Sequence, residues 1–565
     1  MKNIFKANFL FIFFLFLILG SAFAFDVDAQ SGTKSFYVES DYDLYARKNI
    51  EAVLVRTSDN LYFYVEKPWW ESRSSAEQND IRVSLYNLGE EFKNKIYPNL
   101  TFTFGSEWNP GIDNDSRITI LIHEMERGVG GYFRSQDEYY KPQIYSSNEA
   151  EILYFNSQFI TSSFAKSFLA HEFVHLITFN QKDNLRNATD DVWLNEARAE
   201  YASTILGYDD VYEGSYLQKR VKSFLDNPSI SLTEWKNEVE TYGILNVFVQ
   251  YLVDHYGFKI LQDSLFSSKV GIESINYALQ RNGFQKDFAQ IFSDWAVTVL
   301  VNDCSLGSSY CYKNSNLKNF RITPETNFIP TSAESTLTTY NQIKDWSAKW
   351  QRIFGGKGNL TLNFNGGAGI NFKVPYVVCD FDNKCFVKTL TLDKDGKGQI
   401  LISGFSAKYF SLTLVSSVQQ RQSDFTGNGS YYPFSLEIKT RELSGDGDAL
   451  IQSLIEQIAY LQAEIARVQA AINAFLASQG KEQMNFSSCN NFGNDLYYGM
   501  ANNQEVSCLQ QFLKAKDSDI YPEGLVTGNF LSLTFTAVQR YQAKKGITQT
   551  GYFGPLTRTA ANAEL

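Results

Sequence analysis

Two histidines and a glutamate stand within five residues of one another, at His171-Glu172-Phe173-Val174-His175. On a helix, side chains at i and i+4 share one face, so His171 and His175 could bind the same metal ion. Zinc hydrolases use three protein ligands and keep one position for water, whose pKa the ion lowers toward 7. Glu172 could then take the proton of that water and later pass it to a leaving amine. The pattern predicts a hydrolytic zinc site with Glu172 as general base, although a helical histidine pair can also be structural.

A third ligand is expected on a second predicted helix, which contains Trp193-Leu194-Asn195-Glu196-Ala197-Arg198-Ala199-Glu200. Glu196 lies 21 residues after His175, which lets the chain turn and bring this helix antiparallel to the first. Glu200 lies one helical turn further on the same face. There it could accept a hydrogen bond from the free ring nitrogen of His171, or it could belong to a solvated acidic face. We predict His171, His175 and Glu196 as zinc ligands, with Glu200 as the acid that orients His171.

HEFVH followed by WLNEARAEYA resembles the gluzincin metallopeptidases, especially the peptidase-MA-like branch related to thermolysin. The resemblance covers about residues 35–300. It implies a zincin-type catalytic domain, with a mixed sheet over the HExxH helix, a helical half below it, and a substrate cleft between them. The metzincin class requires a Gly and a third His after the second one, and Leu176-Ile177-Thr178-Phe179-Asn180 has neither.

A hydrogen-bond donor for the developing oxyanion is expected in the helical half. Gluzincins commonly use a Tyr or His there, and the stretch from Tyr242 to Leu252 resembles the family's tyrosine-bearing helix. Tyr242 is therefore the predicted donor and His255 the alternative, although the chain has 33 tyrosines and packing is the default role for any one of them. His123, at the end of a predicted strand, is expected to be structural.

Hydrophobic patterns predict the elements that position these residues. Strands are expected at 118–122 and 152–155, and helices at 164–179, 194–206, 244–256 and 288–301. A strand just before the zinc helix, at 130–133 or 148–156, could be an edge that pairs with an extended substrate, or it could be interior. Asp113-Asn114-Asp115 offers oxygen ligands for Ca²⁺, but it lacks the full loop pattern, so a plain turn is expected.

The length of 565 residues suggests several domains, and we predict a multidomain α+β protein. The predicted parts are a signal peptide at 1–24, the metallopeptidase domain at 25–330, a β-sandwich at 331–443, a coiled-coil helix at 447–480 and a three-helix domain at 488–565. The sandwich is expected from short alternating strands with Gly, Asn and Asp turns between them. The coiled coil is expected from four heptads with Ile at a and mostly Leu at d, which favours a parallel homodimer; a helix folded back on a neighbouring domain is the alternative.

The N-terminus is typical of a secretory signal. It has Lys2 and Lys6, an apolar run from Phe9 to Leu19, and a small-x-small cleavage site at Ala22-Phe23-Ala24. An uncleaved membrane anchor is the alternative. Six cysteines form three close pairs, Cys304/Cys311, Cys379/Cys385 and Cys489/Cys508, which suggests disulfides in an exported protein rather than a metal cluster. A net charge of −11 without a basic block argues against nucleic acid as a partner.

The C-terminal pattern resembles the peptidoglycan-binding-domain-1 family over about residues 503–562. The resemblance rests on LQQFL, VTGNF, TAVQRYQ and GYFGPLTR. It implies docking on cell-wall glycan or stem peptide, although members also serve as structural appendages. Together the motifs predict a secreted or wall-associated zinc endopeptidase acting on proteins. The alternatives are a zinc peptidoglycan hydrolase acting on cross-link peptides and a non-catalytic surface-binding protein.

Overall fold

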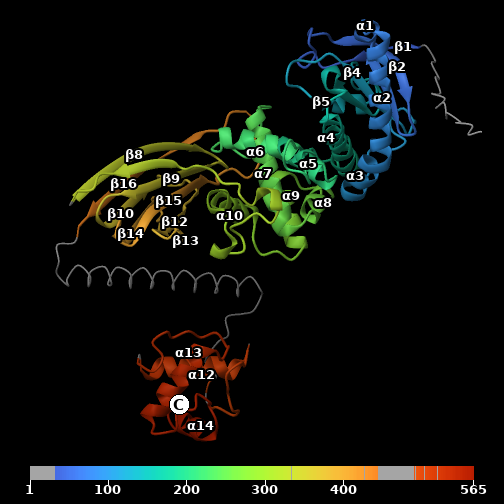
Figure 1. The fold of residues 1–565 in the computed structure, drawn as a ribbon. Helices are drawn as coiled ribbons and strands as arrows, with labels where there is room; N and C mark the ends of the chain where they lie inside the picture. Colours follow the sequence, from blue (N-terminus) through green and yellow to red (C-terminus); the bar gives the residue numbers. More distant parts are fainter. Residues whose placement is uncertain are drawn as a thin grey trace, which may run out of the picture. The chain divides into compact units, whose positions relative to one another are not determined.

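The computed structural model describes residues 32–332, 334–425, 427–442, 489, 491–501, 503–517 and 519–565 (Figure 1). The chain divides into two compact units, Met1–Ser444 and Gly445–Leu565. The protein is a multidomain α+β protein, as predicted, with two sheets in the first unit and helices in both. The predicted signal peptide at 1–24 and the predicted coiled coil at 447–480 lie outside the described residues.

The first sheet is mixed and has six strands in the order β1-β2-β3-β4-β6-β5. They are β1 (Thr33–Tyr37), β2 (Asn49–Thr57), β3 (Leu61–Glu66), β4 (Ile118–His123), β5 (Gly131–Phe133) and β6 (Ile152–Asn156). The central strands β3, β4 and β6 are parallel, and β5 pairs with β6 antiparallel. Every residue of β4 and β6 is buried, as expected for strands covered on both faces. Of the two candidate edge strands, β6 is therefore interior and β5 is the edge.

Helices cover this sheet and continue into a helical half (Figure 1). Those nearest the sheet are α1 (Lys67–Glu71), α2 (Ser75–Glu91), α3 (Tyr97–Phe104), α4 (Ala165–Thr178) and α5 (Val192–Ile205). The helical half contains α6 (Tyr216–Asp226), α7 (Val239–Tyr256), α8 (Lys259–Leu265), α9 (Gly271–Arg281) and α10 (Phe288–Val301). The helix predicted at 244–256 starts earlier, at Val239. One continuous apolar core joins the sheet to both groups of helices.

The helix α4 carries the two histidines and is buried along most of its length, because it packs against β5, β6, α3 and α5. Helix α7 crosses close to α6 at Gly243, where an added Cβ would lie 2.7 Å from the Phe224 main-chain nitrogen. This close approach lets side chains of α6 reach the interior between α5 and α7.

The second sheet has ten strands. They are β7 (Glu325–Ile329), β8 (Glu334–Lys344), β9 (Ala348–Gly355), β10 (Gly358–Asn365), β11 (Phe372–Lys373), β12 (Pro375–Asp380), β13 (Cys385–Thr389), β14 (Lys397–Phe405), β15 (Tyr409–Val418) and β16 (Tyr431–Arg441). Strands β14 and β15 pair only at Phe405 and Tyr409, so the ten-stranded sheet bends sharply there. Its strands form two layers around a shared apolar core. The layering agrees with the expected sandwich, but β7 begins before the predicted boundary at residue 331.

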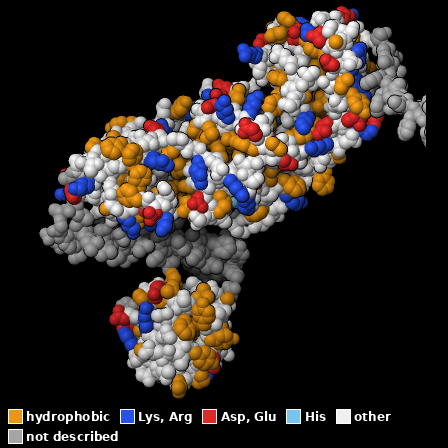
Figure 2. Space-filling model, viewed as in Figure 1, with side chains coloured by type: hydrophobic (Ala, Val, Ile, Leu, Met, Phe, Trp, Pro, Cys, Tyr) orange, Lys and Arg blue, Asp and Glu red, His pale blue; other side chains and the backbone are white. Residues whose placement is uncertain are grey.

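The described residues of the second unit contain three helices, α12 (Gln504–Lys516), α13 (Ser532–Lys544) and α14 (Pro555–Asn562), around their own core. All three predicted disulfides, Cys304–Cys311, Cys379–Cys385 and Cys489–Cys508, are confirmed. Within the described ranges, no helix has the length and apolarity needed to cross a membrane. Lys and Arg side chains are scattered among acidic ones over the visible face of the first unit (Figure 2).

Candidate metal centre

Helices α4 and α5 bring His171, His175 and Glu196 together. The two histidine Nε2 atoms are 3.2 Å apart. Glu196 Oε2 lies 3.2 Å from His171 Nε2 and 3.5 Å from His175 Nε2. Ligands placed tetrahedrally at 2.0–2.1 Å from a zinc ion are about 3.3 Å from one another. The three ligand atoms therefore fit three corners of a zinc site. Among the described residues, they form the group of three His, Cys, Asp or Glu side chains whose ligand atoms lie within 4.8 Å of one another.

The electrostatics of these three side chains favour a positive charge between them. Burial works to raise the pKa of Glu196, but His175 and His171 outweigh it and hold the pKa well below its usual range. Burial likewise works to lower the pKa of His175, but Glu196 dominates and raises it to about 9. A site that stabilises an imidazolium also suits a divalent cation, which would displace the proton.

Glu172 lies beside the ligands, beneath the edge strand β5. An added Cβ at Gly131 would lie 2.6 Å from the Tyr154 carbonyl oxygen and 3.2 Å from Glu172 Cγ, so the β5 backbone passes directly over this carboxylate. Burial raises the pKa of Glu172 above its ordinary value, which makes it a better proton acceptor near neutral pH.

Each histidine has a different neighbour at Nδ1. His175 Nδ1 lies 3.1 Å from Asn195 Oδ1, a hydrogen bond that fixes the tautomer and leaves Nε2 free for a metal. His171 Nδ1 lies 3.6 Å from Glu200 Oε1, which is too long for the predicted hydrogen bond. Glu200 faces His171 as expected, but it is fully buried and so does not belong to a solvated acidic face.

Glu200 is instead held by a buried polar group on α6 and α7. Arg220 donates to both carboxylate oxygens, with Nε 2.9 Å from Oε2 and Nη2 2.7 Å from Oε1. The hydroxyl of Tyr216 and the amide of Asn246 also donate to Glu200, at 3.1 and 3.2 Å. The sequence carried no signal for Arg220, because a lone arginine on an amphipathic helix is normally solvent-facing.

A cleft of about 540 Å³ opens onto these groups. Its walls come from β5, α4, α5, α6 and the start of α7, and its lining includes Tyr42, Phe133, Trp235, Asn237 and Tyr242. The predicted oxyanion donor is therefore in the cleft, with its ring centroid 6.2 Å from that of His171. Burial raises the pKa of Tyr242 far above its usual value, so its hydroxyl is a hydrogen-bond donor at all physiological pH values.

Asn237 connects the two sides of this cleft. It accepts a hydrogen bond of 2.9 Å from the Tyr242 hydroxyl and donates one of 3.3 Å to the Tyr42 hydroxyl. The same segment contacts the sandwich, because Glu234 pairs with the buried Lys344 at 2.5 Å and accepts a hydrogen bond from the Gly429 main-chain nitrogen. The sandwich thus contacts the segment that contributes Trp235 and Asn237 to the cleft lining.

The remaining candidates lie elsewhere. His255, the alternative donor, is absent from the cleft lining, and its Nε2 lies 2.8 Å from the Cys311 carbonyl oxygen. His123 is fully buried and lies 3.3 Å from Asp43, which agrees with a structural role. The 113–115 segment forms a turn, and the Ile112 main-chain nitrogen beside it donates to the buried Glu151.

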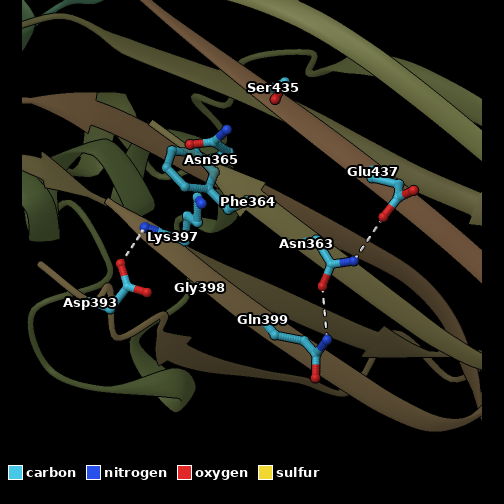
Figure 3. A pocket seen from close by; sticks show the side chains of 9 residues that line it. All are labelled: Asn363, Phe364, Asn365, Asp393, Lys397, Gly398, Gln399, Ser435 and Glu437. Atoms are coloured by element: carbon cyan, nitrogen blue, oxygen red, sulfur yellow. Dashed lines mark hydrogen bonds between the residues drawn. The ribbon is translucent and has the colours of Figure 1, made fainter. Parts of the chain in front are cut away.

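A second hollow of about 560 Å³ lies on the sandwich, over β10, β14 and β16 (Figure 3). Asn363 stands at its centre, where it donates to Glu437 at 2.9 Å and accepts from Gln399 at 2.8 Å. Amide and carboxylate groups that bond one another in this way form a polar surface, but they provide neither a nucleophile nor a metal-ligand set.

Comparison with known proteins gives two kinds of result for this chain. No curated protein matches the chain. Solved structures similar to it include the pre-peptidase C-terminal domain of a Bacillus anthracis collagenase, with 11% identity, 20% of this chain and 96% of that chain covered, and a TM-score of 0.15. Another is the lysozyme inhibitor PliG of Aeromonas hydrophila, with 14% identity, 20% and 97% coverage, and a TM-score of 0.14. Scores this low support no conclusion about fold or function.

The C-terminal unit does have a family match. Residues 502–561 match the family described as "Putative peptidoglycan binding domain". The match includes α12, α13 and all of α14 except its last residue, and it agrees with the resemblance expected from the sequence. The C-terminal unit thus contains a peptidoglycan-binding module.

Proposed function

We propose that this protein is an exported zinc-dependent endopeptidase that hydrolyses peptide bonds of proteins and is held at the cell wall by its C-terminal module. The observation that carries the proposal is the placement of three ligand atoms at the spacing of a tetrahedral zinc site, with Glu172 beside them in an open cleft. The wall attachment is supported by the family match at 502–561, and the export by the disulfides.

His171, His175 and Glu196 would hold the zinc ion, which when bound lowers the pKa of a water molecule and polarises a substrate carbonyl. Glu172 would accept the proton of the attacking water and return it to the leaving nitrogen. Asn195 keeps His175 in the tautomer that can bind a metal. The edge strand β5, which lines the cleft, has free main-chain groups on its outer side and could pair with an extended peptide substrate.

Tyr242 would donate a hydrogen bond to the oxygen that becomes negatively charged in the transition state. Its hydroxyl would first have to leave Asn237. We expect Tyr242→Phe to lower kcat on the order of 10²-fold, as the loss of one such donor does, with zinc content unchanged. Steady-state kinetics with metal analysis checks this, and Tyr340→Phe, on the exposed face of the sandwich, is the control. An unchanged kcat would assign Tyr242 to packing.

The second candidate is a peptidoglycan hydrolase that uses the same site on cross-link peptides, and the wall-binding module is the observation that favours it. Incubating the purified protein with casein and with purified sacculi separates the two activities. We expect new amino groups from casein and none from sacculi. Release of amino groups from sacculi alone would favour the hydrolase, and zinc-loaded protein that cleaves neither substrate would favour a non-catalytic surface protein.

A further inference from the structure

Exposed tyrosines gather beside a short strand pairing in the C-terminal unit. Leu496 and Phe553 form an antiparallel bridge with two main-chain hydrogen bonds, of 3.1 and 2.9 Å. Their neighbours Tyr497 and Tyr552 therefore stand opposite each other. Both side chains are exposed, at 55% and 41%. Figure 2 shows hydrophobic side chains gathered on part of the visible face of this unit.

Two further aromatic residues lie beside the same two chain segments, Tyr498 next to Tyr497 and Phe535 over Gly551, which precedes Tyr552. Tyr498 is 58% exposed, and its ring meets that of Phe535 edge-on, with centroids 6.1 Å apart. Phe535 packs over Gly551, where an added Cβ would lie 2.3 Å from its ring. Tyr497, Tyr498, Phe535 and Tyr552 are here called the tyrosine face.

Half of the tyrosine face lies outside the family match. Tyr497 and Tyr498 belong to the segment 491–501, which precedes the matched residues 502–561. This segment is firmly attached, since Phe492 and Leu496 enter the core of the unit and Cys489–Cys508 joins its start to α12. The backbone at Tyr497 and Tyr498 is thus anchored by its neighbours. The two tyrosine side chains are exposed and do not contribute to the core.

The charged groups beside the face neutralise each other. Asp495 forms an ion pair with Arg558 and accepts a 2.6 Å hydrogen bond from the Tyr552 hydroxyl. A ligand that carries free carboxylate or amino groups, as stem peptides do, would find both of these charged groups already paired. An uncharged ligand with flat apolar surfaces and many hydroxyls needs no unpaired charge and could use the tyrosine rings alone.

We propose that the tyrosine face binds the glycan strand of peptidoglycan. The N-acetylated sugar rings would stack on the tyrosine rings, and their hydroxyl and amide groups would bond the phenol oxygens. Large exposed aromatic surfaces mark interaction sites, and tyrosine provides both an apolar body and a polar tip. This assignment rests on the proposed attachment to the wall and identifies the part of the wall polymer that the module contacts.

The test is sedimentation of the full-length protein with purified sacculi. Tyr497→Ala combined with Tyr498→Ala should weaken binding about tenfold or more, as loss of aromatic contact residues does. Tyr340→Ala, which removes an 84% exposed tyrosine from the sandwich, should bind like the wild type. Soluble N-acetylglucosamine oligosaccharide should compete for binding, and soluble stem peptide should not.

A double variant that sediments like the wild type would overturn the assignment of the face while leaving the wall attachment intact. Competition by stem peptide alone would overturn the glycan as ligand. Wild-type protein that stays in solution would overturn the wall attachment and this assignment together. Since both replaced side chains are largely exposed, an unchanged melting temperature is expected for the double variant and excludes loss of fold as the cause.

Discussion

Replacing Glu172 by Gln should leave zinc bound and reduce peptide hydrolysis by about 10³-fold, within the range that general acid–base catalysis supplies. The amide has nearly the same shape as the carboxylate, so the cleft beneath Gly131 should be preserved. It cannot take a proton from water at neutral pH. Because Glu172 is not one of the three residues at ligand spacing, its loss should not change zinc affinity. Casein cleavage and metal content measured on the same sample check both statements.

Two further variants serve as a control and as a comparison for Glu172→Gln. Glu71→Gln, an exposed position at the end of α1, should cleave casein at the wild-type rate. Glu196→Gln should lose both zinc and activity, since it removes a charged ligand. If Glu172→Gln keeps its activity, or loses its zinc along with it, then the assignment of Glu172 as the general base is wrong.

The second large effect concerns the stability of the first unit. Arg220→Met should destabilise it by about 3–5 kcal/mol, because the buried Glu200 would be left without its cation. Lys222→Met, an exposed position on the same helix, should change the free energy of unfolding by less than about 0.5 kcal/mol. Chemical denaturation followed by circular dichroism measures both.

Double variants distinguish the ion pair from the general packing of α6. If Arg220→Met lowers the free energy of unfolding because Glu200 is left unpaired, then the double variant Arg220→Met/Glu200→Gln should be more stable than Arg220→Met alone. Arg220→Lys should be more stable than Arg220→Met but less stable than the wild type. It keeps a positive charge, but an ammonium group cannot make the two parallel hydrogen bonds that Arg220 donates. Equal losses in the single and double variants would contradict the ion-pair account.

The proximity of His171, His175 and Glu196 could be predicted from the sequence because the three residues are close in the chain. The spacing of His171 and His175 defines one helical face, and Glu196 follows on the next helix. The surroundings of Glu200 could not be predicted, since Arg220, Tyr216 and Asn246 come from other helices and meet it only through tertiary packing. The same holds for Asn237, whose contacts depend on a loop and on Tyr42 in the sheet half.

Strand and helix positions followed from hydrophobic periodicity, with errors at the ends. Helix α7 begins at Val239 rather than near Ile244, because its first turn, Val239-Glu240-Thr241-Tyr242, mixes polar and apolar residues and gives a weaker helical pattern than the apolar run after it. The second sheet starts with β7, whose burial pattern is mostly exposed and so gives a weak strand signal. Which of β5 and β6 forms the edge is a matter of topology, and periodicity carries no information about it.

We propose that a single zinc ion at His171, His175 and Glu196 is required for peptide hydrolysis. The most direct measurement is titration of chelator-treated, metal-free protein with Zn²⁺ while casein cleavage is followed. We predict that activity rises linearly and reaches its plateau at one zinc per chain, and that His175→Ala gains no activity over the same range. Full activity in the metal-free protein, or equal zinc-dependent activity in His175→Ala, would contradict the account.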